Sequence, residues 1–162
     1  MTLFKTSFIT KITVFIASVI LSVSAMALDF NQTQRLANQG DVIAQFNLGN
    51  AYYQGEGVRQ DYAQARQWYQ KSANQGDVIA QYNLGVMYDK GKGVRQDYAK
   101  SFEWYQKSAN QGDASAQFNL GNAYYQGEGV RQNEATAKEF FGKSCDNGNQ
   151  DGCDSYRILN QR

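Results

Sequence analysis

The stretch DVIAQFNLGNAYYQGEGVRQDYAQARQWYQKSANQG, which runs from Asp41 to Gly76, decides the fold of this chain. It returns over residues 77–112 and again over residues 113–148, with a period of 36 residues and no insertion or deletion. The first and second copies agree at 26 of 36 positions, and the first and third copies agree at 23. A fixed period of this size is typical of solenoids, whose units bury their apolar faces by stacking on one another.

Each copy predicts two helices joined by a glycine turn. Asp41 is a good N-cap for the first helix, because its carboxylate can accept hydrogen bonds from the free backbone amides of the first turn. The apolar residues that share one face of this helix are Ala44, Leu48 and Tyr52. The glycines of Gly55–Gly57 can take positive φ and end it. Asp61 starts the second helix, and Gln64 follows it at the spacing of a capping box.

The second helix ends at Gly76, and Asp77 immediately caps the next helix. Its inner stripe consists of Tyr62, Ala65, Trp68, Tyr69, Ser72 and Ala73. A glycine inside the first helix, at Gly49, Gly85 and Gly121, costs roughly 1 kcal/mol relative to alanine. We therefore expect another helix to approach closely there. With no proline and no period-two alternation of strands, the sequence predicts an all-α fold, an α-solenoid of antiparallel helix pairs.

The first 27 residues differ from the rest of the chain. A basic start without acidic residues precedes an almost wholly apolar run over residues 12–26, and the small residues Ala25 and Ala27 follow the pattern of a cleavage site. This order predicts a secretory signal peptide over residues 1–27. An uncleaved membrane anchor is the alternative, but the apolar run is shorter than the roughly 20 residues that span a bilayer.

The segments that flank the three copies predict capping elements. Residues 28–40 match the second half of a copy and predict an N-terminal capping helix. Residues 149–162 match one further first helix without its partner, and their polar residues suit the exposed outer face that the end of a solenoid requires.

Two cysteines, Cys145 and Cys153, lie near the C-terminus. An even number of cysteines in an exported chain favours a disulfide over two free thiols or a partial metal site. In repeat register, Cys145 takes the position of Ala73, and Cys153 takes that of Gln45. These positions should lie close across the turn between two helices. A disulfide that closes so short a loop would contribute about 2 to 3 kcal/mol to stability.

Composition excludes several classes of function. Without residues 1–27 the chain has 14 basic and 15 acidic residues, so no strong field attracts nucleic acid or an anionic membrane. The chain contains no histidine, which removes Ser–His and Cys–His nucleophile pairs and the imidazole ligands of zinc. No serine is followed by lysine three residues later, as the Ser-x-x-Lys pair of serine β-lactamases requires. We expect no catalytic residue, no metal and no cofactor.

The repeated residues resemble the Sel-one-like repeat (SLR) family, a relative of the tetratricopeptide repeat. In the first copy the resemblance rests on Ala44-Gln45, Leu48-Gly49, Tyr52, Gly55, Gly57-Val58, Asp61, Ala65, Trp68-Tyr69 and Ala73. It covers essentially all of residues 29–160 and implies a right-handed superhelix with a concave face. The spacing of Cys145 and Cys153 also looks like the disulfide of exported cysteine-rich members of this family. Those members carry one disulfide in every repeat, whereas this chain has a cysteine pair only after its last copy.

In the geometry that the resemblance implies, the first helices line the concave face, where a partner would bind. The residues that we expect to face it, named here the first-helix face, are Ile43, Phe46, Asn47, Asn50, Tyr53, Tyr82, Asn83, Val86, Asp89, Phe118, Asn119, Asn122 and Tyr125. Amide side chains can bind a peptide backbone, and aromatic rings give rigid contact area. The alternative is that Phe46, Tyr82 and Phe118 belong to the core between repeats. The change from tyrosine to Asp89 in the middle copy indicates an exposed position.

These observations favour an exported, non-catalytic scaffold, periplasmic or secreted, that binds a protein or peptide and is itself a monomer. One alternative, based on cysteine-rich relatives alone, is a β-lactamase or another peptidoglycan-related hydrolase. Another is a factor that binds a host protein such as an immunoglobulin, which some exported relatives do.

Overall fold

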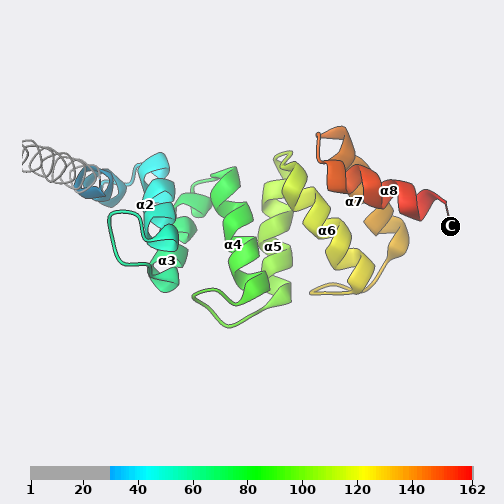
Figure 1. Ribbon diagram of the computed structural model, residues 1–162, viewed down its shortest axis with the longest axis horizontal. Helices are drawn as coiled ribbons and strands as arrows, with labels where there is room; N and C mark the ends of the chain where they lie inside the picture. The colour runs from blue at the N-terminus through cyan, green and yellow to red at the C-terminus, as the bar shows by residue number, and fades with distance from the viewer. Residues whose placement is uncertain (1–29, 162) are drawn as a thin grey trace, which may run out of the picture.

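The computed structural model describes residues 30–161, and the signal peptide expected over residues 1–27 lies outside this range. A helical segment over residues 30–38 comes first. It is followed by α2 (Val42–Gln54), α3 (Tyr62–Asn74), α4 (Val78–Lys90), α5 (Tyr98–Asn110), α6 (Ala114–Gln126), α7 (Glu134–Asp146) and α8 (Gln150–Asn160). The helices stand in a row along the long axis of the molecule, from α2 to α8 (Figure 1). No strand occurs among the described residues, so the predicted α-solenoid is confirmed.

The helices begin at the capping residues that the repeat predicts. The Asp41 carboxylate accepts from the backbone N–H of Ala44 at 2.7 Å, and the Asp61 carboxylate accepts from the N–H groups of Ala63 and Gln64. The second hydrogen bond of the predicted capping box, from the N–H of Asp61 to the side chain of Gln64, is wrong. The N–H of Asp61 donates to the carbonyl of Tyr52 at 2.9 Å instead of to Gln64, because the turn folds back over the end of α2.

The glycine inside each first helix makes room for an aromatic ring of the second helix. A Cβ atom built on Gly49 would lie 2.5 Å from Cδ1 of Tyr69, and one on Gly121 would lie 2.5 Å from Cε1 of Phe141. Real Cβ atoms do not approach other atoms so closely, so the ring and a side chain at this position exclude each other. The predicted close approach is confirmed, and it occurs within a repeat.

Buried glutamines join each first helix to the helix before it. The amide nitrogens of Gln45, Gln81 and Gln117 donate to backbone carbonyls eight residues earlier, at 3.2, 3.1 and 3.3 Å. A buried amide without partners is costly, so these bonds fix how consecutive repeats meet.

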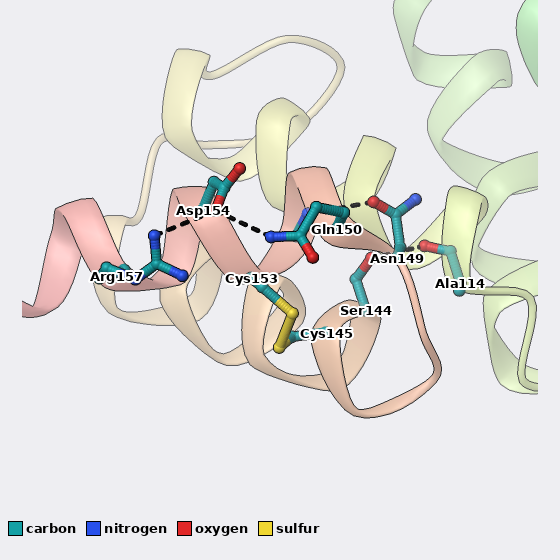
Figure 2. Close-up of a disulfide and its surroundings, with 9 residues drawn as sticks. Ala114, Ser144, Cys145, Asn149, Gln150, Cys153, Asp154 and Arg157 are labelled. Carbon is teal, nitrogen blue, oxygen red and sulfur yellow. Dashed lines mark hydrogen bonds and ion pairs between the residues drawn. A yellow bond between two sulfur atoms is a disulfide. The ribbon is translucent and has the colours of Figure 1, made fainter.

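A disulfide takes the place of this hydrogen bond at the last junction. Cys145 and Cys153 are bonded, with their Cα atoms 4.4 Å apart, which confirms the predicted pair (Figure 2). Beside them, the Ser144 hydroxyl donates to the carbonyl of Ala114 at 2.7 Å. The disulfide therefore holds α8, which packs mainly on α7, to the end of the stack.

The core runs through the stack as a series of clusters between helix pairs. The cluster at the centre contains Tyr69, Leu84, Met87 and Trp104, and the next contains Leu120 with Tyr105. Among helices within residues 30–161, none combines the length and apolarity that a membrane span requires.

Candidate partner-binding face

The first-helix face lies on α2, α4 and α6, and none of its residues is fully buried. Ile43 is 68% exposed and Asn47 is exposed as well, while the other members are half-buried. Half-buried side chains are held in place by the fold and still present surface to a partner. Most of the face is therefore neither fully exposed nor part of the buried core.

Three of the aromatic rings of this face, one in each repeat, pack on the second helix of their own repeat. Phe46 lies 5.9 Å from Tyr69, Tyr82 lies 5.9 Å from Tyr105, and Phe118 lies 5.7 Å from Phe141 between ring centroids, all tilted. One side of each ring thus belongs to the core, as the alternative interpretation held. Because the rings are half-buried, the rest of each ring remains on the surface.

Asparagines of the first-helix face form hydrogen bonds with tyrosine hydroxyls of the second helices. The hydroxyl of Tyr69 donates to Oδ1 of Asn50 at 2.6 Å. Burial raises the pKa of Tyr69, and the amide of Asn83 opposes that rise through a hydrogen bond. Burial also raises the pKa of Tyr105, and the charge of Asp89 raises it further. These tyrosines therefore stay neutral at physiological pH and fix the amides beside them.

The contacts between neighbouring repeats differ along the chain. We call the contact of residues 41–76 with residues 77–112 junction 1/2, and that of residues 77–112 with residues 113–148 junction 2/3. At both, the glycine loop of the later repeat lies against the start of the preceding second helix. A Cβ on Gly93 would collide with the backbone of Tyr62, and one on Gly129 would collide with that of Tyr98. These glycines let each loop bring its neighbouring side chains onto the previous repeat.

At junction 1/2 the loop places Lys92 on two tyrosines. The Lys92 ammonium donates to the hydroxyl of Tyr53 at 2.8 Å and lies 5.0 and 5.5 Å from the ring centroids of Tyr53 and Tyr62. The two rings meet edge to face, 5.0 Å apart. The hydrogen bond with Tyr53 raises the pKa of Lys92. This lysine therefore remains charged, and its side chain fills the space between the two repeats at this junction.

At junction 2/3 the equivalent position is a polar cavity of about 160 Å³. Its wall includes Asp89, Tyr98, Tyr105, Asn119, Asn122 and Glu128. The Asp89 side chain is 20% exposed and forms an ion pair with the Lys90 ammonium at 2.8 Å. The expectation that this position is exposed is wrong, because α5 and the loop before it cover the end of α4. Asp89 instead forms part of the wall of this cavity.

A second hollow of about 330 Å³ lies between the segment 30–38 and α2. Phe30 and Thr33 form one side, and Asn47, Asn50 and Glu56 form the other. The residues that line this hollow occupy the same positions of the repeat as residues that line the cavity at junction 2/3. The predicted asparagines thus line hollows between helix pairs as well as the open face.

Sequence reasoning missed Lys92 and the hydroxyl of Tyr69. Tyr69 belongs to the predicted inner stripe, and its side chain is buried there. Lys92 stands where the other copies have Glu56 and Glu128, and that exchange of charge was the available signal. Within residues 30–161, no group of three or more His, Cys, Asp or Glu side chains is arranged to hold a metal ion.

Stacked helix pairs with an ordered face of rings and amides define the class of α-solenoid repeat scaffolds. A family model described as "Sel1 repeat" matches residues 42–77, 78–113 and 114–149, more than half of the chain. The chain therefore belongs to the Sel1 repeat family, whose repeats are generally protein-interaction modules. No match is found among curated proteins.

Solved structures give the same family. A protective antigen present in uropathogenic Escherichia coli strains, with an SLR fold, is 45% identical over 76% of this chain, with a TM-score of 0.75. The present chain spans only 26% of that antigen's length. A Sel1 repeat protein from Oxalobacter formigenes is 36% identical, with 80% of this chain and 98% of that one covered and a TM-score of 0.74. Cysteine rich protein B of Helicobacter pylori, 23% identical with 79% and 95% covered and a TM-score of 0.64, shares the fold.

Proposed function

We propose that this protein is an exported, non-catalytic scaffold that binds a protein or peptide partner through the first-helix face, on the concave side of the solenoid. The observation that carries this proposal is the recurrence of Phe46, Tyr82 and Phe118, each held by a second-helix ring and each next to an asparagine. Rings fixed in this way lose little entropy on binding, and amides supply donors and acceptors to a peptide backbone.

A charge-matched pair of variants tests this face. The face variant carries Asn47→Arg, Asn83→Arg and Asn119→Arg, one substitution in each repeat. The control carries Gln67→Arg, Asn74→Arg and Asn110→Arg at exposed positions of α3 and α5. We expect the control to retain the partner captured by the wild-type protein from envelope extract, and the face variant to lose it. Partner retention by a face variant with an unchanged melting temperature would contradict the proposal.

The non-catalytic part of the proposal has its own test. Purified protein is mixed with a chromogenic β-lactam, and hydrolysis is followed by absorbance. We expect no turnover above the uncatalysed rate, because the chain lacks histidine and the Ser-x-x-Lys pair. Turnover that copurifies with the protein would support the hydrolase alternative.

A second candidate is a scaffold that leaves the cell and binds a host protein such as an immunoglobulin. The identity of 45% with an antigen of uropathogenic Escherichia coli favours it. Fractionation separates the two candidates, because the first requires the protein in the cell envelope and the second requires it at the surface or in the medium. The same experiment tests export, since the recovered protein should begin at Leu28.

A further inference from the structure

Three of the exchanges between junction 1/2 and junction 2/3 change the groups that fill this position. Tyr53 becomes Asp89, Met87 becomes Ala123, and Lys92 becomes Glu128. Together they remove a ring, a thioether and an ammonium that fill junction 1/2, and they add two carboxylates. Other wall positions change as well: Gln54 becomes Lys90, Arg66 becomes Phe102, and Val86 becomes Asn122. The result is a hollow of about 160 Å³ with hydrogen-bond acceptors in its wall.

Junction 1/2 shows which group this position holds when it is filled. There the Lys92 ammonium lies against the rings of Tyr53 and Tyr62 and donates to a hydroxyl. At junction 2/3, Tyr98 keeps the position of Tyr62, and carboxylates of Asp89 and Glu128 replace the remaining partners. A tyrosine ring with two carboxylates binds an ammonium more strongly than two tyrosine rings do. Lys92 therefore shows which chemical group suits this position of the repeat.

The charges at the cavity leave room for one cation. Asp89 and Glu128 are acidic, and Lys90 is the one basic side chain in the wall. The Lys90 ammonium forms an ion pair with Asp89, its side chain is 65% exposed, and the charge of Glu128 also contributes to raising its pKa. The wall therefore keeps a net charge of −1, which one additional ammonium neutralises. An anion would meet two carboxylates, and an apolar group would remove water from these carboxylates without supplying a hydrogen-bond donor.

We propose that this cavity binds the ammonium of a lysine side chain presented by the protein partner. The ammonium contacts the Asp89 and Glu128 carboxylates and lies beside the ring of Tyr98. The hollow is several times the roughly 30 Å³ that one water takes in the liquid, so it admits an ammonium with its adjoining methylenes. This inference rests on the proposed function, because it names a group by which the partner is recognised.

The test uses peptides with protein expressed from the full-length chain and purified as the cell produces it. The probe is N-acetyl-Gly-Lys-Gly-amide, compared with peptides that carry acetyl-lysine, norleucine or arginine in its place. Binding is followed by NMR shifts of the side-chain amides of Asn119 and Asn122, at up to about 10 mM peptide. We expect saturable shifts with the lysine peptide and none with the acetyl-lysine and norleucine peptides. Arginine binding equal to or tighter than lysine binding would overturn the assignment to an ammonium.

Four variants locate the site. We expect Asp89→Asn and Glu128→Gln each to weaken lysine-peptide binding at least about tenfold, since each removes a charged hydrogen-bond acceptor. Glu56→Gln, the same exchange in the first repeat, should leave it unchanged. Lys90→Gln, which introduces the residue found at Gln54 and Gln126, should tighten it several-fold because a competing ammonium is removed.

The outcomes separate this site from the proposed function. Absence of saturable shifts with the wild-type protein, or unchanged affinity in folded Asp89→Asn, would overturn the lysine site. Retention of the captured partner by that variant would leave the scaffold function in place. The face variant also changes Asn119 in the cavity wall, so a version with Asn47→Arg and Asn83→Arg alone tests the scaffold function apart from the lysine site.

Discussion

Junctions 1/2 and 2/3 are built from the same 36-residue template and yet have different interiors. Met87 is fully buried at the first, where Tyr53 and Lys92 complete the packing. At the second, Ala123 and Asp89 stand in the corresponding positions, and a polar cavity remains. The positions that recur maintain the stack, and the positions that change decide whether a junction is filled or hollow.

The largest expected effect concerns a feature that all three repeats share, the glycine under the second-helix ring. Gly49→Val should lower the free energy of unfolding by at least about 3 kcal/mol, because the new side chain and the Tyr69 ring would occupy the same space. Gly142→Ala is the control, since its Cβ would meet only Tyr156, at 3.3 Å. Urea unfolding followed by circular dichroism measures both, and equal stability of the two variants would contradict this role.

The next prediction exchanges the residues that distinguish the junctions. Met87→Ala should cost about 2 to 4 kcal/mol, because it opens a cavity at a fully buried position. The reverse exchange, Ala123→Met, should change stability by less than about 1 kcal/mol, since the cavity already has room. It should also reduce binding of the lysine peptide. Thermal melts and the peptide titration check the pair, and a larger loss from Ala123→Met than from Met87→Ala would reverse the comparison.

The last junction extends the comparison, because a disulfide there replaces a buried glutamine. Replacing both Cys145 and Cys153 with serine should cost about 2 kcal/mol, since the pair closes a short loop. The matched variant, Cys145→Ala with Cys153→Gln, rebuilds the internal pair Ala73 and Gln81, which form a hydrogen bond of 3.1 Å. It should recover about 1 kcal/mol. Calorimetry measures the melting temperatures of the wild-type protein and both variants. An unchanged melting temperature after reduction of the wild-type protein would show that the disulfide does not stabilise it.

Much of the fold could be predicted because the repeated positions act locally. A cap such as Asp41 accepts from an amide three residues away, and the glycine turn follows from backbone geometry. The candidate site was harder to predict from the sequence, because its contacts join residues that are distant along the chain. Tyr69 reaches Asn50 across 19 residues, and Lys92 reaches Tyr53 across 39. One copy of the repeat does not tell toward which neighbour a long side chain extends, so a face could be predicted but not its cavity.

The smallest expected effect uses the hydroxyls that the third repeat lacks. Burial raises the pKa of Tyr69 and Tyr105 above the ordinary value of 10.0, while Phe141 has no hydroxyl at this position. Above pH 10 the unfolded chain releases these protons before the folded protein does. The contribution of both tyrosines is therefore present below pH 10 and is lost as the pH rises beyond it.

Tyr69→Phe with Tyr105→Phe should remove this part of the alkaline destabilisation. It should also cost about 1 kcal/mol at neutral pH, since the bond from Tyr69 to Asn50 is lost. Urea unfolding at pH 8 and at pH 10.5 measures both effects, and Tyr125→Phe, on the first-helix face, is the matched control. An equal pH slope in wild-type and double-variant protein would mean that lysines, such as Lys90 with its raised pKa, carry the alkaline response. The contribution of these tyrosines to stability would then be their hydrogen bonds alone.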